Sequence, residues 1–398
     1  MSSVQTLQPM TSFVSDSHLL TDKHREFRAE LKAFLDAQVE EIAAEYEATE
    51  RFPRELLLEK MAPKGYLGLP FPEEFGGRGE DSLSLAILIE ECSRTWGSLG
   101  IILAAHIGLG SNPIFAFGNE EQKKKYLTPL AKGERLGGYG LTEPSAGSDS
   151  GATKTTAVFD GTHWVLNGSK AWCTNATEAY SYVVSAVTDP EAGHRGISAF
   201  IVERDFPGFS FGKKEDKMGL RASATGTLIF DNCRVPAENL LGEEGMGFKY
   251  FMQTLDGGRI TIGAMALGLA QCALDEVLRT LKDTELKDDL WENEYRMAPI
   301  AEIATDVAAA RHMIYNAAIQ KQNLKRWTLD GAFAKFFASE IAMRATDKAV
   351  EYLAENGLTM NCKVSRAFRD TKLTTIGEGT NEIHRVVIAR EILKKIAE

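Results

Sequence analysis

Apolar residues recur at helical spacing through the first third of the chain. Between Thr21 and Ala48 they fall three or four residues apart, at Phe27, Leu31, Phe34, Leu35, Val39, Ile42 and Ala43, which is typical of one face of an amphipathic helix. Thr21 or Asp22 is a candidate cap, so one long helix is predicted there. Further helical runs follow at 54–64, 82–95, 98–117 and 120–132, separated by Gly and Pro turns. We predict an all-α domain over residues 21–132, after a polar and flexible tail at residues 1–20.

The periodicity changes to alternation near Gly133. Asp160-Gly161 and Asn167-Gly168 favour tight hairpin turns and bracket a short strand candidate at 163–166. β-branched or aromatic runs follow at 182–187, 197–202 and 227–230. We therefore predict two successive hairpins within an antiparallel β-barrel or sandwich that occupies residues 133–243.

Helical spacing returns at Gly245 and continues to the end of the chain. Four long helices are predicted at 248–281, 300–324, 331–354 and 382–396, and three of them are rich in small side chains that permit close packing. The fold class is thus a multidomain α+β protein, with an N-terminal all-α domain, a middle antiparallel β-barrel or sandwich, and a C-terminal four-helix bundle over residues 244–398.

Composition excludes several classes of protein. The chain has 398 residues, 44% of them hydrophobic and 25% charged, which is ordinary for a globular protein. A formal net charge of −11 argues against nucleic acid as the main partner, because phosphate binding needs a basic face. Five cysteines without a CxxC pair or a nearby His indicate reduced thiols rather than disulfides or zinc, and no window is expected to be long enough to span a membrane. We expect a soluble, cytoplasmic protein without a metal site.

Glu378 is the first candidate for chemistry, because it lies between Gly377 and Gly379 just before the last predicted helix. Flanking glycines let the backbone approach a ligand closely. The helix dipole would stabilise the Glu378 anion while burial would raise its pKa, so a base that titrates near working pH is one interpretation. A solvated Glu in a glycine turn is the other. His384 and Arg385, further along, are expected to lie on the helix surface.

Two polar stretches flank the start of the β domain. The loop 138–149 mixes Gly, Thr and Ser, which suits a phosphate or a polar ring edge, but it matches neither the Rossmann nor the Walker pattern. Trp172 and Thr174 alternate, so they are predicted on one face of a strand, as an aromatic wall and a hydroxyl. A plain loop and a core Trp remain the alternatives. Asp256 and Arg259, three apart on a predicted helix, would ordinarily form a structural ion pair.

Five motifs together resemble the acyl-CoA dehydrogenase family, in order and in spacing, from about Thr21 to the end. They are Gly-Tyr-Gly-Leu-Thr-Glu-Pro-Ser-Ala-Gly-Ser-Asp at 138–149, Trp-Cys-Thr-Asn at 172–175, Lys-Met-Gly-Leu-Arg-Ala-Ser at 217–223, Arg-Val-Pro-Ala-Glu-Asn-Leu-Leu-Gly at 234–242 and Gly-Glu-Gly-Thr-Asn-Glu-Ile-His-Arg at 377–385. The resemblance implies an FAD-dependent enzyme that oxidises an acyl thioester to its α,β-enoyl form.

The resemblance also implies a role for each matching residue. Glu378 would remove the α-proton while flavin N5 takes the β-hydride. The flavin would be lined by Tyr139, Leu141, Thr142, Trp172, Thr174, Thr380, Asn381 and Glu382. Ser148 would contact FAD phosphate or pantetheine, and Asp256, Arg259 and Gly379 the substrate. Expected partners are acyl-CoA, an electron-transfer flavoprotein as acceptor, and further subunits, either identical or related.

The chain departs from the family pattern in three places. An Arg-x-x-Phe-Gly motif that reaches across a subunit interface to the outer half of FAD is replaced by residues 279–283, Arg-Thr-Leu-Lys-Asp. Positions that usually carry Gln and paired glycines read Glu351, Ala354 and Glu355. Three interpretations are open: the outer half of FAD is held by different contacts, FAD binds weakly, or a related subunit completes the FAD site. Gly377 replaces a common aromatic residue, which predicts room for a branched, cyclic or bulky acyl group.

Other functions stay open at this stage. Some relatives carry the base just before the Arg of the long helix, where this chain has Gly258, so Glu378 is the best candidate. A dehydrogenase for acyl groups on a carrier protein would use similar contacts. A non-catalytic or half-site subunit would not need Glu378, Trp172 and Thr174, and flavin monooxygenases on this fold do not use the Glu.

Overall fold

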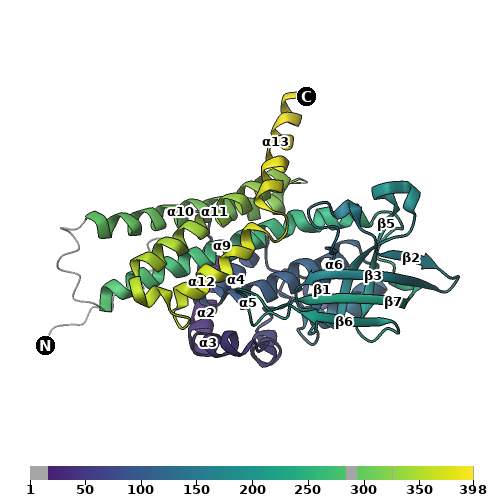
Figure 1. Cartoon of the computed structure of the whole chain (residues 1–398), viewed down its shortest axis with the longest axis horizontal. Helices are drawn as coiled ribbons and strands as arrows, with labels where there is room; N and C mark the ends of the chain where they lie inside the picture. The colour runs from purple at the N-terminus through teal and green to yellow at the C-terminus, as the bar shows by residue number, and fades with distance from the viewer. Residues whose placement is uncertain (1–16, 284–293, 325, 398) are drawn as a thin grey trace.

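Helices occupy both ends of the chain and strands occupy its middle (Figure 1). The computed structural model describes residues 17–283, 294–324 and 326–397. Most of the predicted tail, residues 1–16, lies outside the described residues. Ser17 and Leu20 are buried, so the packed structure begins before Thr21.

The N-terminal third is helical, as predicted. Its helices are α2 (Asp22–Gln38), α3 (Glu40–Thr49), α4 (Ser82–Thr95), α5 (Gly97–Ala104), α6 (Asn112–Phe117), α7 (Glu120–Gln122) and α8 (Thr128–Ala131). Thr21 caps α2, and its hydroxyl accepts a hydrogen bond from the His24 backbone N–H. The prediction of one helix over 21–48 is wrong, because the chain leaves helical geometry at Val39, with φ −120°. The bend leaves Leu35, Val39 and Ala43 all buried in the core.

Among the described residues, two helical segments are long and apolar enough to cross a membrane by length and composition, which corrects the expectation that no such window exists. They are Gly97–Phe117 and Gly247–Leu281, and 72% and 94% of their most apolar windows are buried inside the protein. Apolar composition on all sides is what a core helix needs.

Seven strands form one mixed sheet in the part of the chain that the structure describes. They are β1 (Gly137–Gly140), β2 (Thr156–Phe159), β3 (His163–Cys173), β4 (Ser181–Val187), β5 (Ile197–Glu203), β6 (Phe209–Lys214) and β7 (Gly226–Pro236). The order along the sheet is β1-β4-β2-β3-β7-β6, and β5 pairs with β4. The antiparallel prediction fails at β1, which runs parallel to β4. The β2–β3 hairpin lies between them in the chain, and this crossover lets the two strands run in the same direction.

The two predicted hairpin turns have different outcomes. Asp160-Gly161 does join β2 to β3, with Gly161 at φ +102°. Asn167-Gly168 instead lies inside β3, where the register with β7 shifts. Gly168 has φ +142°, and a Cβ there would lie 2.6 Å from Thr155 Oγ1. The dipeptide therefore forms a bulge, because β3 continues along β7 rather than turning back.

The C-terminal third is built around one long central helix. The helices are α9 (Gly247–Asp283), α10 (Glu294–Asn323), α11 (Thr328–Tyr352), α12 (Lys363–Thr371) and α13 (Asn381–Ala397). Helix α9 packs against α4, α10, α11 and α12. The sequence did not predict α12. Helix α13 contacts α11 near its start and then projects away from the body (Figure 1).

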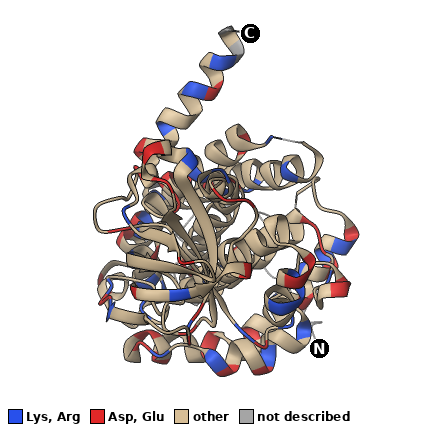
Figure 2. Ribbon diagram, turned by 90° about the vertical axis from the view of Figure 1, so that its right-hand side faces the viewer, with Lys and Arg blue, Asp and Glu red and all other residues tan. Residues whose placement is uncertain are grey.

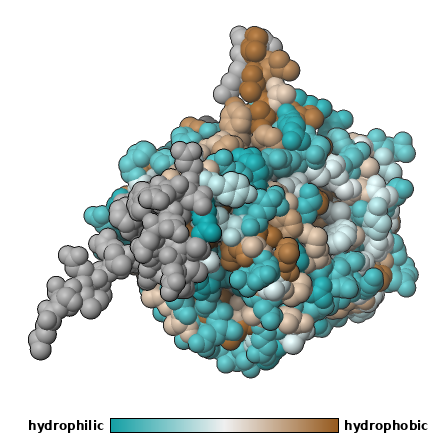
Figure 3. Space-filling model, turned by 60° about the vertical axis from the view of Figure 1, so that its left-hand side comes forward, coloured by the Kyte–Doolittle hydropathy of each residue, from teal (hydrophilic) through white to brown (hydrophobic). Residues whose placement is uncertain are grey.

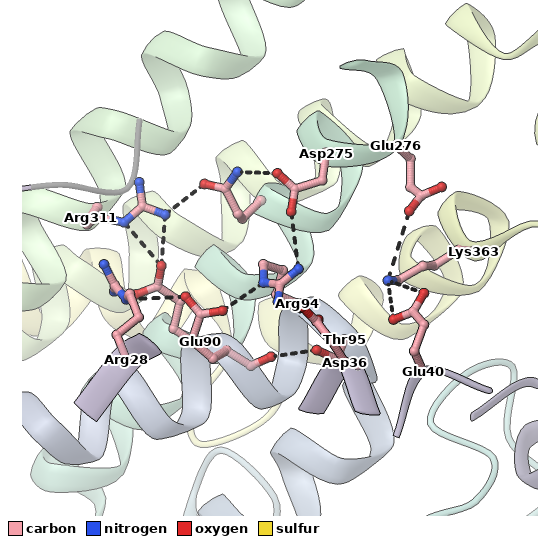
Figure 4. A network of polar contacts seen from close by, with 12 residues as sticks. Arg28, Asp36, Glu40, Glu90, Arg94, Thr95, Asp275, Glu276, Arg311 and Lys363 are labelled. Atoms are coloured by element: carbon pink, nitrogen blue, oxygen red, sulfur yellow. Dashed lines mark hydrogen bonds and ion pairs between the residues drawn. The ribbon is translucent and has the colours of Figure 1, made fainter. Parts of the chain in front are cut away.

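A buried polar network joins the N-terminal helices to the bundle (Figure 4). Glu90 of α4 accepts hydrogen bonds from Arg311 of α10, at 2.8 and 3.1 Å, and forms an ion pair with Arg28 of α2 at 3.0 Å. Arg311 also donates to Gln271 of α9. The network therefore ties four helices together. On the outside, basic and acidic residues intermix over the face that Figure 2 shows.

Candidate active site

Glu378 is held in a tight turn between two helical segments. A short 3₁₀ turn, Lys372–Thr375, precedes it, and Gly377 N–H donates to Leu373 O at 2.8 Å. Glu378 has φ +53°, in the left-handed region, and Gly379 has φ +96°. A left-handed conformation costs a non-glycine residue about 1–3 kcal/mol and is concentrated at functional sites. Thr380 then caps α13, since its hydroxyl accepts from Ile383 N–H.

The Glu378 carboxylate lies against α9. A Cβ built on Gly258 would be only 1.6 Å from Glu378 Oε2, so the carboxylate occupies the space that any side chain at 258 would need. Glu378 Oε2 is buried and has no hydrogen-bond partner among the residues that the structure describes. Burial raises the pKa of Glu378 to about 7, although the Lys335 and Arg259 charges oppose the rise. The turn thus presents a desolvated carboxylate with a free oxygen.

Strand β1 and helix α9 bring two of the predicted residues, Tyr139 and Arg259, within range of the Glu378 charge. The Tyr139 hydroxyl is buried without a partner in the described part of the chain, and burial and the Glu378 charge raise its pKa. Arg259 forms an ion pair with Asp256 at 2.5 Å, and Thr328 donates to the same Asp at 2.7 Å. Arg259 Nε is buried and lacks a partner among the described residues. The Arg259–Asp256 ion pair therefore has a structural role. It still leaves Arg259 Nε as an unused donor close to Glu378.

Two residues at this site were missed by the sequence reasoning. Lys335 of α11 is fully buried and donates to Gly379 O at 2.7 Å and to Asn381 Oδ1 at 3.0 Å. Its sequence signal is a lone Lys in an apolar helical stripe. His384 was expected at the surface, and this is wrong, because the first turn of α13 is packed and the ring is 0% exposed. Burial lowers the pKa of His384 to about 3, so the ring is neutral.

The loop 141–149 is fixed to β3 by a buried ion pair. Glu143 accepts from Lys170 Nζ at 2.6 Å and from the backbone N–H groups of Lys154 and Thr155, at 2.7 and 3.0 Å. Lys170 and the neighbouring donors hold the pKa of Glu143 at about 2, despite its burial. The loop also joins β3 directly, since Ala171 N–H donates to Thr142 O at 2.8 Å.

Trp172 stands beside this loop, but not as predicted. It has φ +58° and is 61% exposed, and β3 ends at Cys173, so Trp172 and Thr174 do not share a strand face. The left-handed residue breaks the alternation. A large aromatic side chain held out from the sheet, next to a fixed polar loop, fits a planar ring. The buried free atoms of Glu378 and Tyr139 fit the same flavin half of FAD.

The other predicted residues lie at different depths. Leu141, Thr142, Thr174, Gly379 and Thr380 are half-buried, and Ser148 and Glu382 are exposed. Asn381 is buried, and its side chain bonds to α11 through Lys335, Ser339 and Glu340.

A groove of about 470 Å³ lies next to both departures in the outer FAD region, and its lining includes Arg279, Leu353 and Asn356. Arg279 is paired with Glu276, and Lys363 with Glu40 at 2.7 Å. Two of the three cations that line the groove are therefore already paired with carboxylates, and the third, Arg366, donates to Thr95 O. Within the described ranges, no cluster of His, Cys, Asp or Glu suits a metal ion.

Comparison with known proteins agrees with this geometry. Three family models match consecutive parts of the chain: the acyl-CoA dehydrogenase N-terminal domain at residues 21–134, the middle domain at 138–233 and the C-terminal domain at 245–393. The short-chain specific acyl-CoA dehydrogenase of Clostridium acetobutylicum is 45% identical over 376 residues, which are 94% of this chain and 99% of that protein.

Two solved structures are similar over nearly the whole chain. A chain in the structure of the electron transferring flavoprotein of Acidaminococcus fermentans is 43% identical with a TM-score of 0.92, covering 95% of this chain and 100% of that one. An acyl-CoA dehydrogenase from Bacillus anthracis, complexed with FAD, is 34% identical with a TM-score of 0.88, covering 95% of this chain and 68% of that one.

The chain belongs to the acyl-CoA dehydrogenase family. It is an oxidoreductase that dehydrogenates an acyl-CoA with FAD as its cofactor. The predicted fold class, activity and cofactor are thereby confirmed.

Proposed function

We propose that Glu378 is the base that removes the α-proton of the acyl thioester. The buried, unpartnered Oε2 carries this proposal. An α C–H beside a thioester is a weak acid, so its removal needs a desolvated base whose pKa lies near the working pH. With its pKa raised to about 7, Glu378 meets both conditions. FAD supplies the acceptor for the β-hydride.

We assign roles to the surrounding residues from the match of the sequence motifs to the acyl-CoA dehydrogenase family. Tyr139, Leu141, Thr142, Trp172, Thr174, Thr380, Asn381 and Glu382 would line the flavin, and Ser148 would contact phosphate or pantetheine. Asp256 and Arg259 would lie on the substrate side. The backbone N–H of Gly379 would donate to the thioester oxygen, where negative charge develops as the α-proton leaves.

Gly377 supports a further proposal about the acyl group. A Cβ at Gly377 would be in ordinary contact with Leu373, at 3.4–3.5 Å, so a side chain could begin here without a clash and the glycine leaves that volume unfilled. A branched, cyclic or bulky acyl chain would use this space. A panel of branched, cyclic and linear acyl-CoAs tests this, and turnover of short linear thioesters alone would contradict it.

The experiment for the base is anaerobic mixing of the yellow holoprotein with each thioester, followed by visible absorption. We expect one thioester to bleach the wild-type flavin and leave Glu378→Gln oxidised. The matched control is Glu121→Gln, an exposed residue of α7, which should bleach like the wild type. Bleaching of Glu378→Gln at the wild-type rate would remove Glu378 as the base. Bleaching only by a carrier-protein thioester would establish the carrier protein as the substrate donor.

We further propose an oligomer that transfers electrons to an electron-transfer flavoprotein in the cytoplasm. The projecting part of α13 exposes apolar side chains, with Leu393 62% and Ile396 75% exposed (Figure 3). A second subunit would cover them. Light scattering with FAD stoichiometry tests the assembly. A multiple of 43.7 kDa with one FAD per chain supports a homo-oligomer, and a flavin-free chain would indicate a half-site subunit.

The division into an N-terminal domain (21–132), a middle domain (133–243) and a C-terminal domain (244–398) also remains a proposal. Limited proteolysis near residues 133 and 244 would test it.

A further inference from the structure

We propose that Lys335 is a positioning residue for proton abstraction: it fixes the turn that carries Glu378 and supplies a buried positive charge that favours the ionised form of this base. The inference rests on the proposed role of Glu378. Lys335 lies on α11, far from the turn in sequence, and neither the motifs nor the flavin contacts include it.

The first support is geometric. Lys335 Nζ donates to Gly379 O at 2.7 Å, so it holds the peptide directly after the Glu378-Gly379 pair. It also donates to Asn381 Oδ1 at 3.0 Å, at the first residue of α13. One ammonium group thus joins the turn to the start of the following helix. The two contacts restrict the turn that presents the carboxylate to α9.

Close helix packing allows this buried position. A Cβ on Gly263 of α9 would lie 3.5 Å from the Lys335 backbone, in ordinary contact, so α9 and α11 pack closely here. The Lys335 side chain is 0% exposed. An ammonium group is costly to bury unless hydrogen bonds and charges compensate it.

The second support is the pattern of charges. The partners of Lys335 Nζ are neutral oxygens, and within the described residues no carboxylate lies at ion-pair distance from it. Its charge is therefore not cancelled by a direct pair and acts on Glu378. The charged and titratable groups that share this environment are Arg259 of α9, Tyr139 of β1, Glu340 of α11, and Glu382 and His384 of α13.

The charges of Lys335 and Glu378 are coupled. Burial lowers the pKa of Lys335 to about 7, and the Glu378 charge opposes that shift. Each group therefore favours the charged form of the other. Loss of the Lys335 charge would raise the pKa of Glu378, so less of the base would be ionised at neutral pH.

The test is the rate of anaerobic flavin reduction by substrate, measured from pH 5.5 to 9 on the holoprotein. For the wild type we expect the rate to rise with pH through about 7. Lys335→Met removes the charge and both hydrogen bonds, and Lys335→Gln keeps a donor without charge. Both should move the midpoint up by about one pH unit or more, which makes reduction at pH 7 at least roughly fivefold slower. Lys335→Gln keeps the test valid if Lys335→Met does not fold.

Two controls separate charge from structure. Lys335→Arg keeps the positive charge and should keep the wild-type midpoint. Ser339→Ala, one turn further along α11, removes the other α11 donor to Asn381 Oδ1, a hydroxyl at 3.0 Å, and should also keep the midpoint. Thermal melting and flavin absorbance establish that each variant is folded and loaded.

The outcomes are distinct. An unchanged midpoint in Lys335→Gln, or an equal loss of rate at every pH, would overturn the inference and reduce Lys335 to a structural role. Flavin reduction at the wild-type rate in Glu378→Gln would instead overturn the proposed base. If Glu378→Gln is inactive and the Lys335→Gln midpoint is shifted, both proposals stand.

Discussion

Gly258→Ala is the sharpest perturbation of the site, because it adds one carbon atom at the base. The new Cβ would lie 1.6 Å from Glu378 Oε2 and 2.6 Å from the carboxyl carbon. Real Cβ contacts are not found below 3.0 Å. The oxygen must therefore move by about 1.4 Å.

A displacement of this size is enough to disable proton abstraction. Misplacing a reacting group by about 1 Å costs on the order of 100-fold in rate. We therefore expect the limiting rate of flavin reduction to fall at least 100-fold. Stability should change little, because replacing Gly with Ala in a helix gains about 1 kcal/mol, which offsets the local repacking.

The neighbouring glycine provides a matched control. In Gly257→Ala the new Cβ would lie 3.2 Å from Lys321 Nζ, the end of a flexible side chain that can move aside. This variant has the same gain in helix propensity without contact to Glu378, so its rate should stay within about threefold of the wild type. Stopped-flow reduction of all three proteins is the assay. Equal rates in both variants would refute the contact between Gly258 and the base.

Two further predictions concern the buried charges away from the base. Burial and the Glu47 charge raise the pKa of Asp370 to about 8, while Leu220 N–H donates to it at 2.6 Å. The folded pKa exceeds the unfolded one, so the stability contributed by the protonated form is lost as pH rises towards 8. Asp370→Asn keeps the acceptor without the charge, and its Tm should fall less between pH 5 and 8.5; parallel curves would contradict this. Arg311→Met leaves Glu90 with fewer buried partners and should cost about 3–5 kcal/mol of unfolding free energy. Arg344→Met, which breaks an ion pair that is half-exposed on the Arg side, should cost less than about 1 kcal/mol in the same denaturant titration.

Local chemistry was enough to predict most elements. The cap at Thr21 and the Asp160-Gly161 turn depend on neighbours in sequence, and both are present. The bulge at Gly168 and the parallel pairing of β1 depend on strands far away in the chain. A dipeptide that favours a turn cannot reveal that β7 continues alongside, so the sequence predicted a hairpin there.

The site residues also differ in whether their role depends on neighbours in sequence or on distant parts of the chain. Glu378 was predicted from its flanking glycines and its motif, which are continuous in sequence. Lys335 was not, because its role depends on the close approach of α9 and α11 at Gly263. His384 was placed wrongly for the converse reason: α13 looks amphipathic throughout, but among its described side chains the fully buried ones, Asn381 and His384, lie in the first turn.

The two halves of the expected FAD site depart from the family pattern to different degrees, and this difference bears on whether the chain is catalytic. Around the flavin half, Glu378, Tyr139 and Arg259 keep buried atoms with unused hydrogen-bonding capacity. Such atoms are destabilising in a protein that binds nothing there, since each costs about 1–3 kcal/mol. In the outer groove, by contrast, Arg279 and Lys363 are already paired with carboxylates. A subunit that had lost its function would have no reason to keep the costly half and neutralise the other. The contrast favours a working base and flavin pocket over a non-catalytic subunit.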